Sequence, residues 1–422
     1  MLSKVDNELL TQTDRGTLMG EYLRRYWHPI MLAEEVPEPD SSPKRVRILG
    51  EELVGYRDTN GDIGLLDNYC PHRRASMFFG RNEECGLRCV YHGWKFDKDG
   101  NCVDMPSEPP ESNFKDKVHI TAYPAKEQGG LIWAYLGPLD KMPELPQLEW
   151  ARIPSDQLIL SKRLQQSNFM QAVEGGIDSS HVSFLHTVLD QKNQDDLATS
   201  GVTIQEFMMA DKSPRFIINE TDPGLLIAAR RNASDTDYYW RITQFLLPYF
   251  TMIPGTPGYP IGGHAWVPID NETCYNYSIT WHPSRPITKS ELEFHLSGVG
   301  IHTEVDKMFR PIRNKENDYV IDREVQRSKT FTGILGIGEQ DMAVQESMGF
   351  IIDRSREHLG SSDAAVIAMR RRMLREARKL EEGIEPFAPS NKSAYKVRSA
   401  AVVLARDIPF QEGAREELQS IP

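Results

Sequence analysis

The sequence has no hydrophobic run long enough to cross a membrane. A transmembrane helix needs roughly 18 or more consecutive apolar residues, and no stretch of the 422-residue chain approaches that length. The first ten residues, MLSKVDNELL, also lack the apolar core of a signal peptide. We therefore expect a cytoplasmic protein without a membrane partner.

Positive charge is in deficit. The chain carries 49 Lys and Arg against 61 Asp and Glu, a formal net charge of −12 at pH 7. Such a chain lacks the electrostatic attraction that drives non-specific binding to nucleic acid, so no nucleic-acid partner is expected. The charge says little about a small-molecule substrate.

Cysteine is scarce, with five residues in the chain. An odd number without framework spacing does not indicate a set of disulfides. Two of the five, Cys70 and Cys89, belong to a motif described below. We interpret Cys85, Cys102 and Cys274 as small buried or half-buried side chains.

The length predicts two or three domains, and the pattern of residues changes along the chain. Residues 1–27 contain short helical patterns. Residues 28–141 alternate in short runs between turn signals, which predicts antiparallel strands joined by hairpins. The linker-like, proline-containing segment 138–154 leads into a second domain, which we place at 142–422.

The second domain mixes helical and strand patterns. A helical composition runs from Gln165 through Asp178 to Leu189, and long strand candidates follow between residues 215 and 282. A helix returns near residue 290 and another at 363–380, where apolar residues recur at helical spacing. The whole chain is therefore predicted to be α+β, with antiparallel sheets in both domains.

Two Cys/His pairs stand out in the first domain. Cys70 and His72 form a CPH motif, Cys89 and His92 form a CVYH motif, and sixteen residues separate the two. Two thiolates and two imidazoles from two loops are a metal site by spacing. A structural zinc would hold all four ligands on one ion, whereas a Rieske [2Fe-2S] cluster would hold two Cys on one iron and two His on the other. The position of each pair after a strand-like run favours the Rieske cluster.

A second group of possible ligands lies in the second domain. Asp178, His181 and His186 bring a carboxylate and two imidazoles within nine residues. Two neutral His and one carboxylate form the facial triad of non-haem Fe(II) oxygenases. On an ideal helix the two His would be about 140° apart, so a shared ion requires a broken or bulged turn between them. The alternative is a pair of ordinary helix histidines.

Together the motifs resemble those of the Rieske non-haem iron aromatic-ring oxygenases, over nearly the whole chain. The similarity is carried by NYCPHRRASMFFGRNEECGLRCVYHGWKFD, EGGIDSSHVSFLH and EQDMAVQESMGFIIDRSREHLGSSD. These stretches are typical of the phthalate-dioxygenase-like branch, in which an oxygenase component without a β-subunit works with a flavin and iron–sulfur reductase. The branch includes phthalate and phenoxybenzoate dioxygenases and O-demethylases of lignin-derived aromatic acids.

The resemblance implies a fold and a third metal ligand. A Rieske β-sandwich domain would precede a catalytic domain of the helix-grip type, with helices flanking an antiparallel sheet. Asp341 would complete the triad with His181 and His186. Three other carboxylates compete with it on composition alone, although Asp353 resembles a structural ion-pair partner of Arg354: Glu339, Glu346 and Asp353.

The resemblance also implies an assembly and a source of electrons. Asp178 would hydrogen-bond His181 of its own chain and a cluster His of a neighbouring chain, so that electrons cross between subunits. This requires a ring-shaped homotrimer, either alone or stacked into a hexamer. The electrons would come from NADH through the reductase, and O₂ would be the co-substrate.

The substrate class depends on the strands after residue 215. An aromatic ring over the iron needs an apolar cavity, and these strands are rich in Tyr, Phe and Trp. A carboxylate on the ring would need a cationic partner once it is desolvated, and Arg suits that role. Strand alternation turns about half of the side chains inward. The candidate substrate residues are Ser179, Arg215, Arg230, Arg231 and Arg241.

We therefore expect the terminal oxygenase component of a system that hydroxylates an aromatic carboxylic acid, with ring dihydroxylation of a phthalate- or phenoxybenzoate-like acid as the leading reaction. O-demethylation of a methoxylated aromatic acid is the alternative, because the sequence does not show which carbon is presented to the iron. A Rieske electron-transfer protein without catalysis is a rival of another class. The long region after Pro138, with its own possible metal ligands, argues against that rival.

Overall fold

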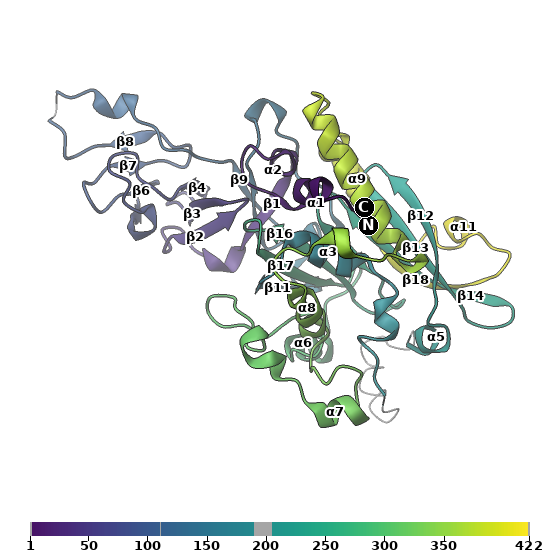
Figure 1. Cartoon of the computed structure of the whole chain (residues 1–422). Helices are drawn as coiled ribbons and strands as arrows, with labels where there is room; N and C mark the ends of the chain where they lie inside the picture. Colours follow the sequence, from purple (N-terminus) through teal and green to yellow (C-terminus); the bar gives the residue numbers. More distant parts are fainter. Residues whose placement is uncertain (1, 110, 190–204, 421–422) are drawn as a thin grey trace.

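The computed structural model describes residues 2–109, 111–189 and 205–420 (Figure 1). Two short helices open the chain: α1, Lys4–Thr11, and α2, Leu18–Leu23. Each starts at a hydroxyl N-cap, because Ser3 and Thr17 accept hydrogen bonds from backbone N–H groups of the first turn. These caps replace bonds that the first turn of a helix cannot make internally.

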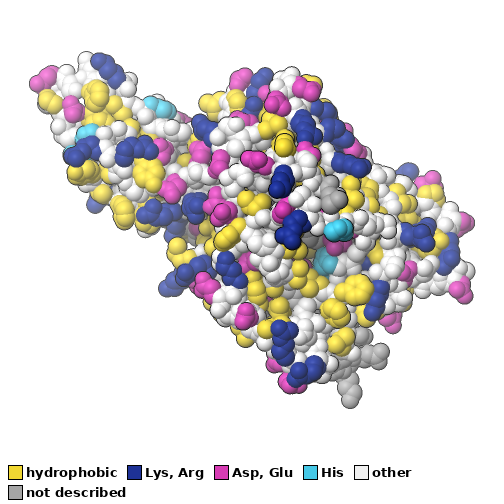
Figure 2. Space-filling view, viewed as in Figure 1, with side chains coloured by type: hydrophobic (Ala, Val, Ile, Leu, Met, Phe, Trp, Pro, Cys, Tyr) yellow, Lys and Arg dark blue, Asp and Glu magenta, His cyan; other side chains and the backbone are white. Residues whose placement is uncertain are grey.

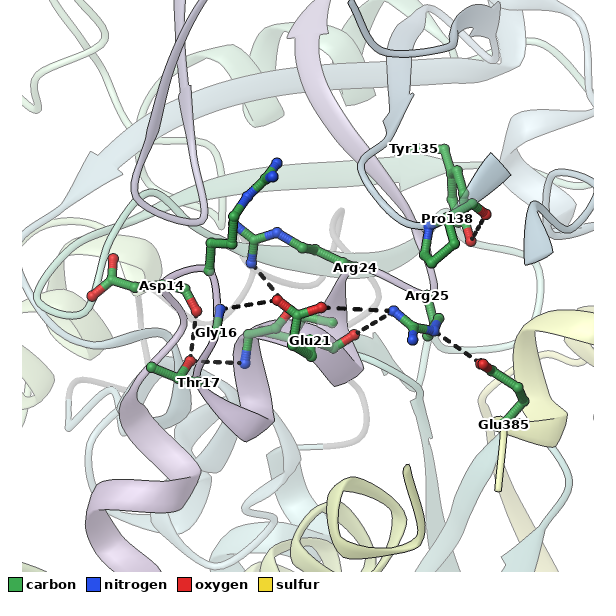
Figure 3. A network of polar contacts seen from close by, with 12 residues as sticks. Asp14, Gly16, Thr17, Glu21, Arg24, Arg25, Tyr135, Pro138 and Glu385 are labelled. Atoms are coloured by element: carbon green, nitrogen blue, oxygen red, sulfur yellow. Dashed lines mark hydrogen bonds and ion pairs between the residues drawn. The ribbon is translucent and has the colours of Figure 1, made fainter. Parts of the chain in front are cut away.

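Charged side chains fasten α2 to a distant part of the chain (Figure 3). The Glu21 carboxylate accepts a 2.9 Å hydrogen bond from the Gly16 backbone N–H and lies 3.9 Å from the Arg25 guanidinium. Arg25 also forms a 2.9 Å ion pair with Glu385, which follows the long C-terminal helix. The N-terminal helical segment is therefore attached to the second domain.

Three small antiparallel sheets make up the first domain, in the orders β1-β10-β9, β2-β3-β4 and β5-β6-β7-β8. Figure 1 shows this domain as a lobe that projects from the rest of the molecule, with β6, β7 and β8 at its far end. The strands are β1 (Trp27–Leu32), β2 (Lys44–Ile48), β3 (Glu51–Arg57), β4 (Ile63–Asp67), β5 (Arg81–Glu83), β6 (Gly86–Arg88), β7 (Lys95–Phe96), β8 (Cys102–Asp104), β9 (Ala125–Gln128) and β10 (Leu131–Tyr135).

An eight-stranded antiparallel sheet organises the second domain, in the order β11-β17-β16-β15-β14-β13-β12, with β18 also paired to β14. Strand β14 changes partner along its length, because its first half pairs with β18 and its last residues pair with β15. The strands are β11 (Leu158–Gln165), β12 (Arg215–Thr221), β13 (Gly224–Asn232), β14 (Asp237–Leu246), β15 (Phe250–Ile253), β16 (Ile261–Pro268), β17 (Cys274–Trp281) and β18 (Ala400–Ala405).

Helices flank this sheet. Helix α3 packs against β14, β15 and β16, and α9 packs against β12 and β13. The apolar stripe expected on α9 is confirmed, because Met369, Met373 and Ala377 are fully buried. The helices are α3 (Phe169–Ile177), α5 (Gln205–Ala210), α6 (Lys289–Leu296), α7 (Arg323–Ser328), α8 (Ile337–Ser347), α9 (Ala364–Glu381), α10 (Phe387–Ser390) and α11 (Phe410–Gly413).

A buried charge cluster joins α3 to α9. Glu174 on α3 lies 2.8 Å from Arg354 and 2.7 Å from Arg370, and both guanidinium groups are almost fully buried. The sequence suggested an ion pair between Asp353 and Arg354, and this prediction is wrong. The Asp353 carboxylate instead accepts hydrogen bonds from Ser355, because Arg354 is directed inward to Glu174.

The α+β class with antiparallel sheets in both domains is confirmed. The expected helix through Asp178 to Leu189 is wrong, because α3 ends at Ile177 and Asp178 has an extended backbone. Strands β11 and β18 were not expected from the sequence pattern. The strand β18 segment, AAVVLA, has little alternation to distinguish a strand from a buried helix.

Neither sign of charge is concentrated on the face of the molecule that Figure 2 shows. Figure 2 shows acidic and basic side chains interspersed over the visible face of both lobes. Among the residues described, no helix combines the length and apolar character needed to cross a membrane.

Candidate metal centres and substrate cavity

The two Cys/His motifs lie on two loops with the same backbone geometry. Cys70 N–H donates to Ala75 O at 2.9 Å, and Cys89 N–H donates to Trp94 O at 2.8 Å. The return bonds also match, because Arg74 N–H donates to Cys70 O and Gly93 N–H to Cys89 O, both at 2.9 Å. Arg74 and Gly93 have left-handed backbones, with φ of 60° and 79°. Such strain at a non-glycine residue is typical of a functional loop.

The loops bring like ligands together. The Cys70 and Cys89 side chains are buried, and the neighbouring Cys70 lowers the pKa of Cys89. The backbone N–H groups of His72 and His92 act on the two sulfurs, each lowering the pKa of the Cys in its own motif. The imidazoles of His72 and His92 form a separate pair, with ring centroids 4.4 Å apart, and His72 stacks on Trp94.

This arrangement fits two metal ions better than one. Four ligands on a single tetrahedral zinc would lie within about 4 Å of one another. In the part of the chain described here, no three of these four ligand atoms lie within 4.8 Å of one another. A thiolate pair beside an imidazole pair matches the two ends of a Rieske [2Fe-2S] cluster. Backbone N–H groups that act on the sulfurs would also tune its potential.

A second group of ligands meets that spacing. His181, His186 and Asp341 offer ligand atoms within 4.8 Å of one another. The two His Nε2 atoms are 3.1 Å apart, and Asp341 Oδ1 lies 3.5 Å from His181 Nε2 and 3.4 Å from His186 Nε2. Three ligands at right angles around one ion, each about 2.1 Å from it, would lie about 3 Å apart. The group therefore fits a facial triad.

Local backbone structure creates this geometry. Helix α3 ends after Gly175 and Gly176, and the chain then forms a 3-10 turn at His181–Ser183. The turn breaks the helical spacing that would hold the two His on different faces, which is the break that a shared ion requires. Asp341 comes from α8, which packs against α3.

Each His is held from behind by a different group. Asp178 Oδ2 lies 3.4 Å from His181 Nδ1, and Gln340 Oε1 lies 2.8 Å from His186 Nδ1. Burial alone would raise the pKa of Asp341, but the two imidazoles lower it to about 2. Burial would lower the pKa of His186, but Asp341 and Gln340 outweigh it and raise that pKa. Gln340 was not identified from the sequence, since a neutral amide beside a ligand has no distinctive spacing.

The competing carboxylates have other partners. Glu339 forms a 3.0 Å ion pair with Arg313, and Glu346 accepts from the hydroxyl of Tyr319 at 2.6 Å. Asp353 is exposed and caps a short turn. None of the three contacts the two His side chains.

A cavity of about 730 Å³ opens beside the triad. Its volume is within the range of small-molecule sites. Strands β14 to β17 form one wall, and α6, α8 and the end of α3 form the others. Most of the lining is apolar, and it includes Val182, Met208, Ile253, Trp266, Phe294 and Ile301.

The four candidate arginines lie in different places. Arg241 lines the cavity, and no carboxylate of the described chain lies within ion-pairing distance of it. Arg230 lies on the sheet face opposite to the cavity, where its guanidinium is 4.2 Å from the centroid of the Tyr238 ring. Arg215 is exposed. Neighbouring residues of a strand point to opposite faces of the sheet, and residues paired across two strands share a face. Arg231 pairs with Tyr239, which lines the cavity, whereas Arg230 pairs with Trp240 on the opposite face. Arg215 and Arg230 therefore do not reach the cavity.

Ser179 does not line the cavity. It instead forms hydrogen bonds with two of the candidate arginines. Its hydroxyl accepts a 2.8 Å hydrogen bond from Arg241, and its carbonyl accepts a 2.6 Å bond from Arg231. Arg231 is fully buried. Its pKa is lowered to about 10, mainly by desolvation and in second place by the nearby positive charge of Arg241. The two arginines thus hold the turn between Asp178 and His181.

These features define a Rieske-type oxygenase: paired Cys/His loops on a β-domain, and a two-His, one-carboxylate triad beside a cavity. Residues 26–124 match the Rieske [2Fe-2S] domain and residues 134–417 match the LigXa C-terminal domain like family. The chain belongs to the Rieske non-haem iron oxygenases of this type. The family predicted from the motifs is confirmed, and the reading as an electron-transfer protein without catalysis is set aside.

Relatives and solved structures agree with this assignment. The phthalate 4,5-dioxygenase oxygenase subunit of Pseudomonas putida is 39% identical over 98% of this chain and 94% of its own. The 3-chlorobenzoate-3,4-dioxygenase oxygenase subunit of Comamonas testosteroni is 34% identical over 99% and 98%. The 5,5'-dehydrodivanillate O-demethylase oxygenase subunit of Sphingobium sp. is 32% identical over 100% and 91%. The carbazole 1,9a-dioxygenase terminal oxygenase of Nocardioides aromaticivorans shares the fold, with 18% identity, a TM-score of 0.58, and 88% and 97% coverage.

Proposed function

We propose that this protein is the terminal oxygenase component of a system that hydroxylates an aromatic carboxylic acid, using O₂ and electrons from an NADH-dependent reductase. One observation carries the substrate class. Arg241 presents a guanidinium to the cavity beside the triad, with no carboxylate partner within ion-pairing distance among the described residues. A partly buried cation without a counter-ion is costly, so an anionic ligand fits this position.

The cofactor ligands follow from the two side-chain groups described above. Cys70, His72, Cys89 and His92 would hold the [2Fe-2S] cluster, and His181, His186 and Asp341 would hold one iron ion. When bound, the cluster supplies electrons one at a time, and the iron supplies a site for O₂ activation. The domains would be divided near residue 141.

The chain's own residues position the substrate. Arg241 would bind the carboxylate, and the Ser179 hydroxyl fixes the guanidinium by accepting one of its N–H groups. The apolar walls, including Trp266 and Ile253, would enclose the ring and exclude water. Anchoring the acid at one end determines which ring carbon faces the triad.

The assembly would be a homotrimer or a stacked hexamer. Figure 1 shows the loops next to β6 and β7 at the far end of the projecting lobe, well separated from α8 in the same chain. A cluster on a neighbouring chain would avoid that separation. Asp178 would then connect His181 with a cluster His of the neighbour, because a carboxylate can accept from both imidazoles. Exposed apolar residues beside the ligand loop, Val90 and Tyr91, would suit such a contact.

O-demethylation is the second candidate reaction. The relative from Sphingobium is an O-demethylase oxygenase subunit and aligns over the whole chain. Both reactions need the same triad and the same acid anchor, and they differ in whether a ring carbon or a methoxy carbon faces the iron. Formaldehyde release from methoxybenzoates would identify demethylation.

The test combines metal analysis with substrate discrimination. The purified protein should be red-brown and hold three iron atoms per chain, two in the cluster and one in the triad. With a reductase and NADH, O₂ uptake should be faster with benzoates, phthalates, phenoxybenzoates or methoxybenzoates than with their amides or methyl esters. Equal rates for acids and neutral analogues would contradict the acid class, and fully active protein with only cluster iron would contradict the oxygenase mechanism.

A further inference from the structure

Among the residues that the structure describes, Nδ1 of His186 has one hydrogen-bond partner, the side chain of Gln340. Gln340 Oε1 lies 2.8 Å from His186 Nδ1, and Gln340 Nε2 donates to the backbone carbonyl of Ile334 at 2.9 Å. Gln340 is only 5% exposed, so these are contacts of a buried side chain. It directly precedes Asp341 on α8.

These two contacts determine which way the amide points. A backbone carbonyl can only accept, so the nitrogen of the Gln340 amide must face Ile334. The amide oxygen then faces His186, and an oxygen there requires that His186 carry its proton on Nδ1. Nε2 is left with a free lone pair. Nε2 is also the atom that lies 3.4 Å from Asp341 Oδ1 and 3.1 Å from His181 Nε2.

We propose that Gln340 is a positioning residue for the mononuclear metal: its amide oxygen fixes the tautomer and ring orientation of His186. Helix α8 thereby supplies one ligand directly, through Asp341, and orients a second through the preceding residue. The two His ligands are held unequally, since His181 faces the carboxylate of Asp178 and His186 faces a neutral amide. A neutral acceptor orients an imidazole without adding a negative charge to the site. This inference rests on the proposed function only in that the triad binds a divalent metal.

A purely structural role would depend on Nε2 of Gln340, which bonds Ile334, whereas the positioning role depends on Oε1, which faces His186. The bond to Ile334 needs a donor, whereas the bond to His186 needs an acceptor. Gln340→Glu keeps an acceptor in place and loses the donor, because an ionised carboxylate only accepts. Gln340→Leu removes both, and Gln340→Asn keeps the amide on a side chain one methylene too short. Gln345→Leu is the matched control, because Gln345 is also 5% exposed on α8 and bonds Gln165 rather than a metal ligand.

The experiment measures Fe(II) affinity of the full-length protein by anaerobic competition with a chromogenic chelator. Gln340→Leu and Gln340→Asn should raise the dissociation constant of the mononuclear iron by about 10–100-fold, the usual effect of losing such a partner. Gln340→Glu should stay within about threefold of wild type, and so should Gln345→Leu. The visible spectrum of the Co(II)-substituted protein should change in the Leu variant and remain close to wild type in the control.

Other results would overturn the inference. If Gln340→Glu binds iron as weakly as Gln340→Leu, the contact with Ile334 is the important one. If all three Gln340 variants bind iron like wild type, Gln340 does not position His186. If wild type itself holds no mononuclear metal, the proposed function fails together with this inference. Unchanged cluster absorbance in every variant shows that the first domain is intact, so that the comparison concerns the triad alone.

Discussion

Arg241 Nη1, in the wall of the cavity, donates a 2.8 Å hydrogen bond to the hydroxyl of Ser179, the residue after Asp178. The proposed acid anchor, Arg241, and the turn that carries His181 are therefore directly connected. Burial lowers the pKa of Arg241, and an arginine guanidinium is charged at neutral pH in proteins. A bound carboxylate would complete its hydrogen bonds.

The first prediction concerns this anchor. Arg241→Gln should reduce kcat/KM for an aromatic acid by roughly 100-fold, because a charge-assisted contact is lost and a carboxylate is left unpaired. The rate with the neutral methyl ester should change far less. Arg230→Gln is the control, since Arg230 lies on the other face of the sheet and should keep wild-type kinetics. An equal loss for acid and ester would argue against a carboxylate at Arg241.

The second prediction concerns the third metal ligand. Asp341→Ala should lose the mononuclear iron and turnover while the cluster spectrum stays intact, because the triad and the cluster lie in different domains. Asp353→Asn should retain both metals, as its carboxylate is exposed and caps a turn. Iron analysis together with EPR of the reduced cluster measures both. Retention of three irons in Asp341→Ala would show that another residue is the ligand.

The third prediction concerns electron transfer. Asp178→Asn should keep both metals but lower product formation by about 100-fold, since an amide cannot accept from two imidazoles as a carboxylate does. Rapid-mixing experiments should show normal reduction of the cluster and slow reoxidation in the presence of substrate and O₂. Near-normal turnover of the variant would contradict a bridging role.

The metal ligands differ in how far the sequence reveals them. The Cys/His motifs are local, so their spacing indicates a metal site, whereas the spacing of His181 and His186 alone left a pair of ordinary helix histidines open until the two motifs were taken together. Asp341 is distant in the sequence and could be selected only from the family resemblance. Gln340 could not be selected at all, because its role depends on the packing of α8 against the turn that carries His186.

The substrate residues show a different limit. Alternation predicts that some of the strand arginines face inward, but the register of β13 against β14 decides which ones. The wrong helix at 178–189 had a signal in the sequence, since Gly175, Gly176 and the polar residues after Ile177 weaken a helix. Because α3 ends at Ile177, the following turn can bring the imidazoles of His181 and His186 together.

The fourth prediction concerns stability and its pH dependence. Glu174→Gln should lower the unfolding temperature by at least about 5 °C at pH 7, because it leaves the buried guanidinium of Arg354 without a carboxylate partner. Burial alone would raise the pKa of Glu174, but Arg354 and Arg370 lower it below its ordinary value of 4.5. The stabilising contribution is therefore complete above about pH 4.5 and is lost as the pH falls through the lower folded-state pKa.

Calorimetry at several pH values would test this. The difference in unfolding temperature between wild type and Glu174→Gln should be largest at neutral pH and shrink below pH 4.5. Glu220→Gln is the control, because Glu220 pairs with Arg372 and Arg375 at an exposed position and should change stability by less than about 1 kcal/mol. A difference that grows on acidification would contradict the assigned sign.

Strand β18 has a consequence for how the protein is made. Ala401 pairs with Arg241, and Val403 with Tyr239, although the partners are 160 and 164 positions apart in the chain. A ribosome adds about 5–20 residues per second, so β14 waits about 8–32 s for this partner after its own synthesis. During that interval the edge of β14 is open to pairing with other chains. The strand that carries the proposed acid anchor thus gains this partner long after its own synthesis, and until then the growing chain is exposed to aggregation at its proposed substrate site.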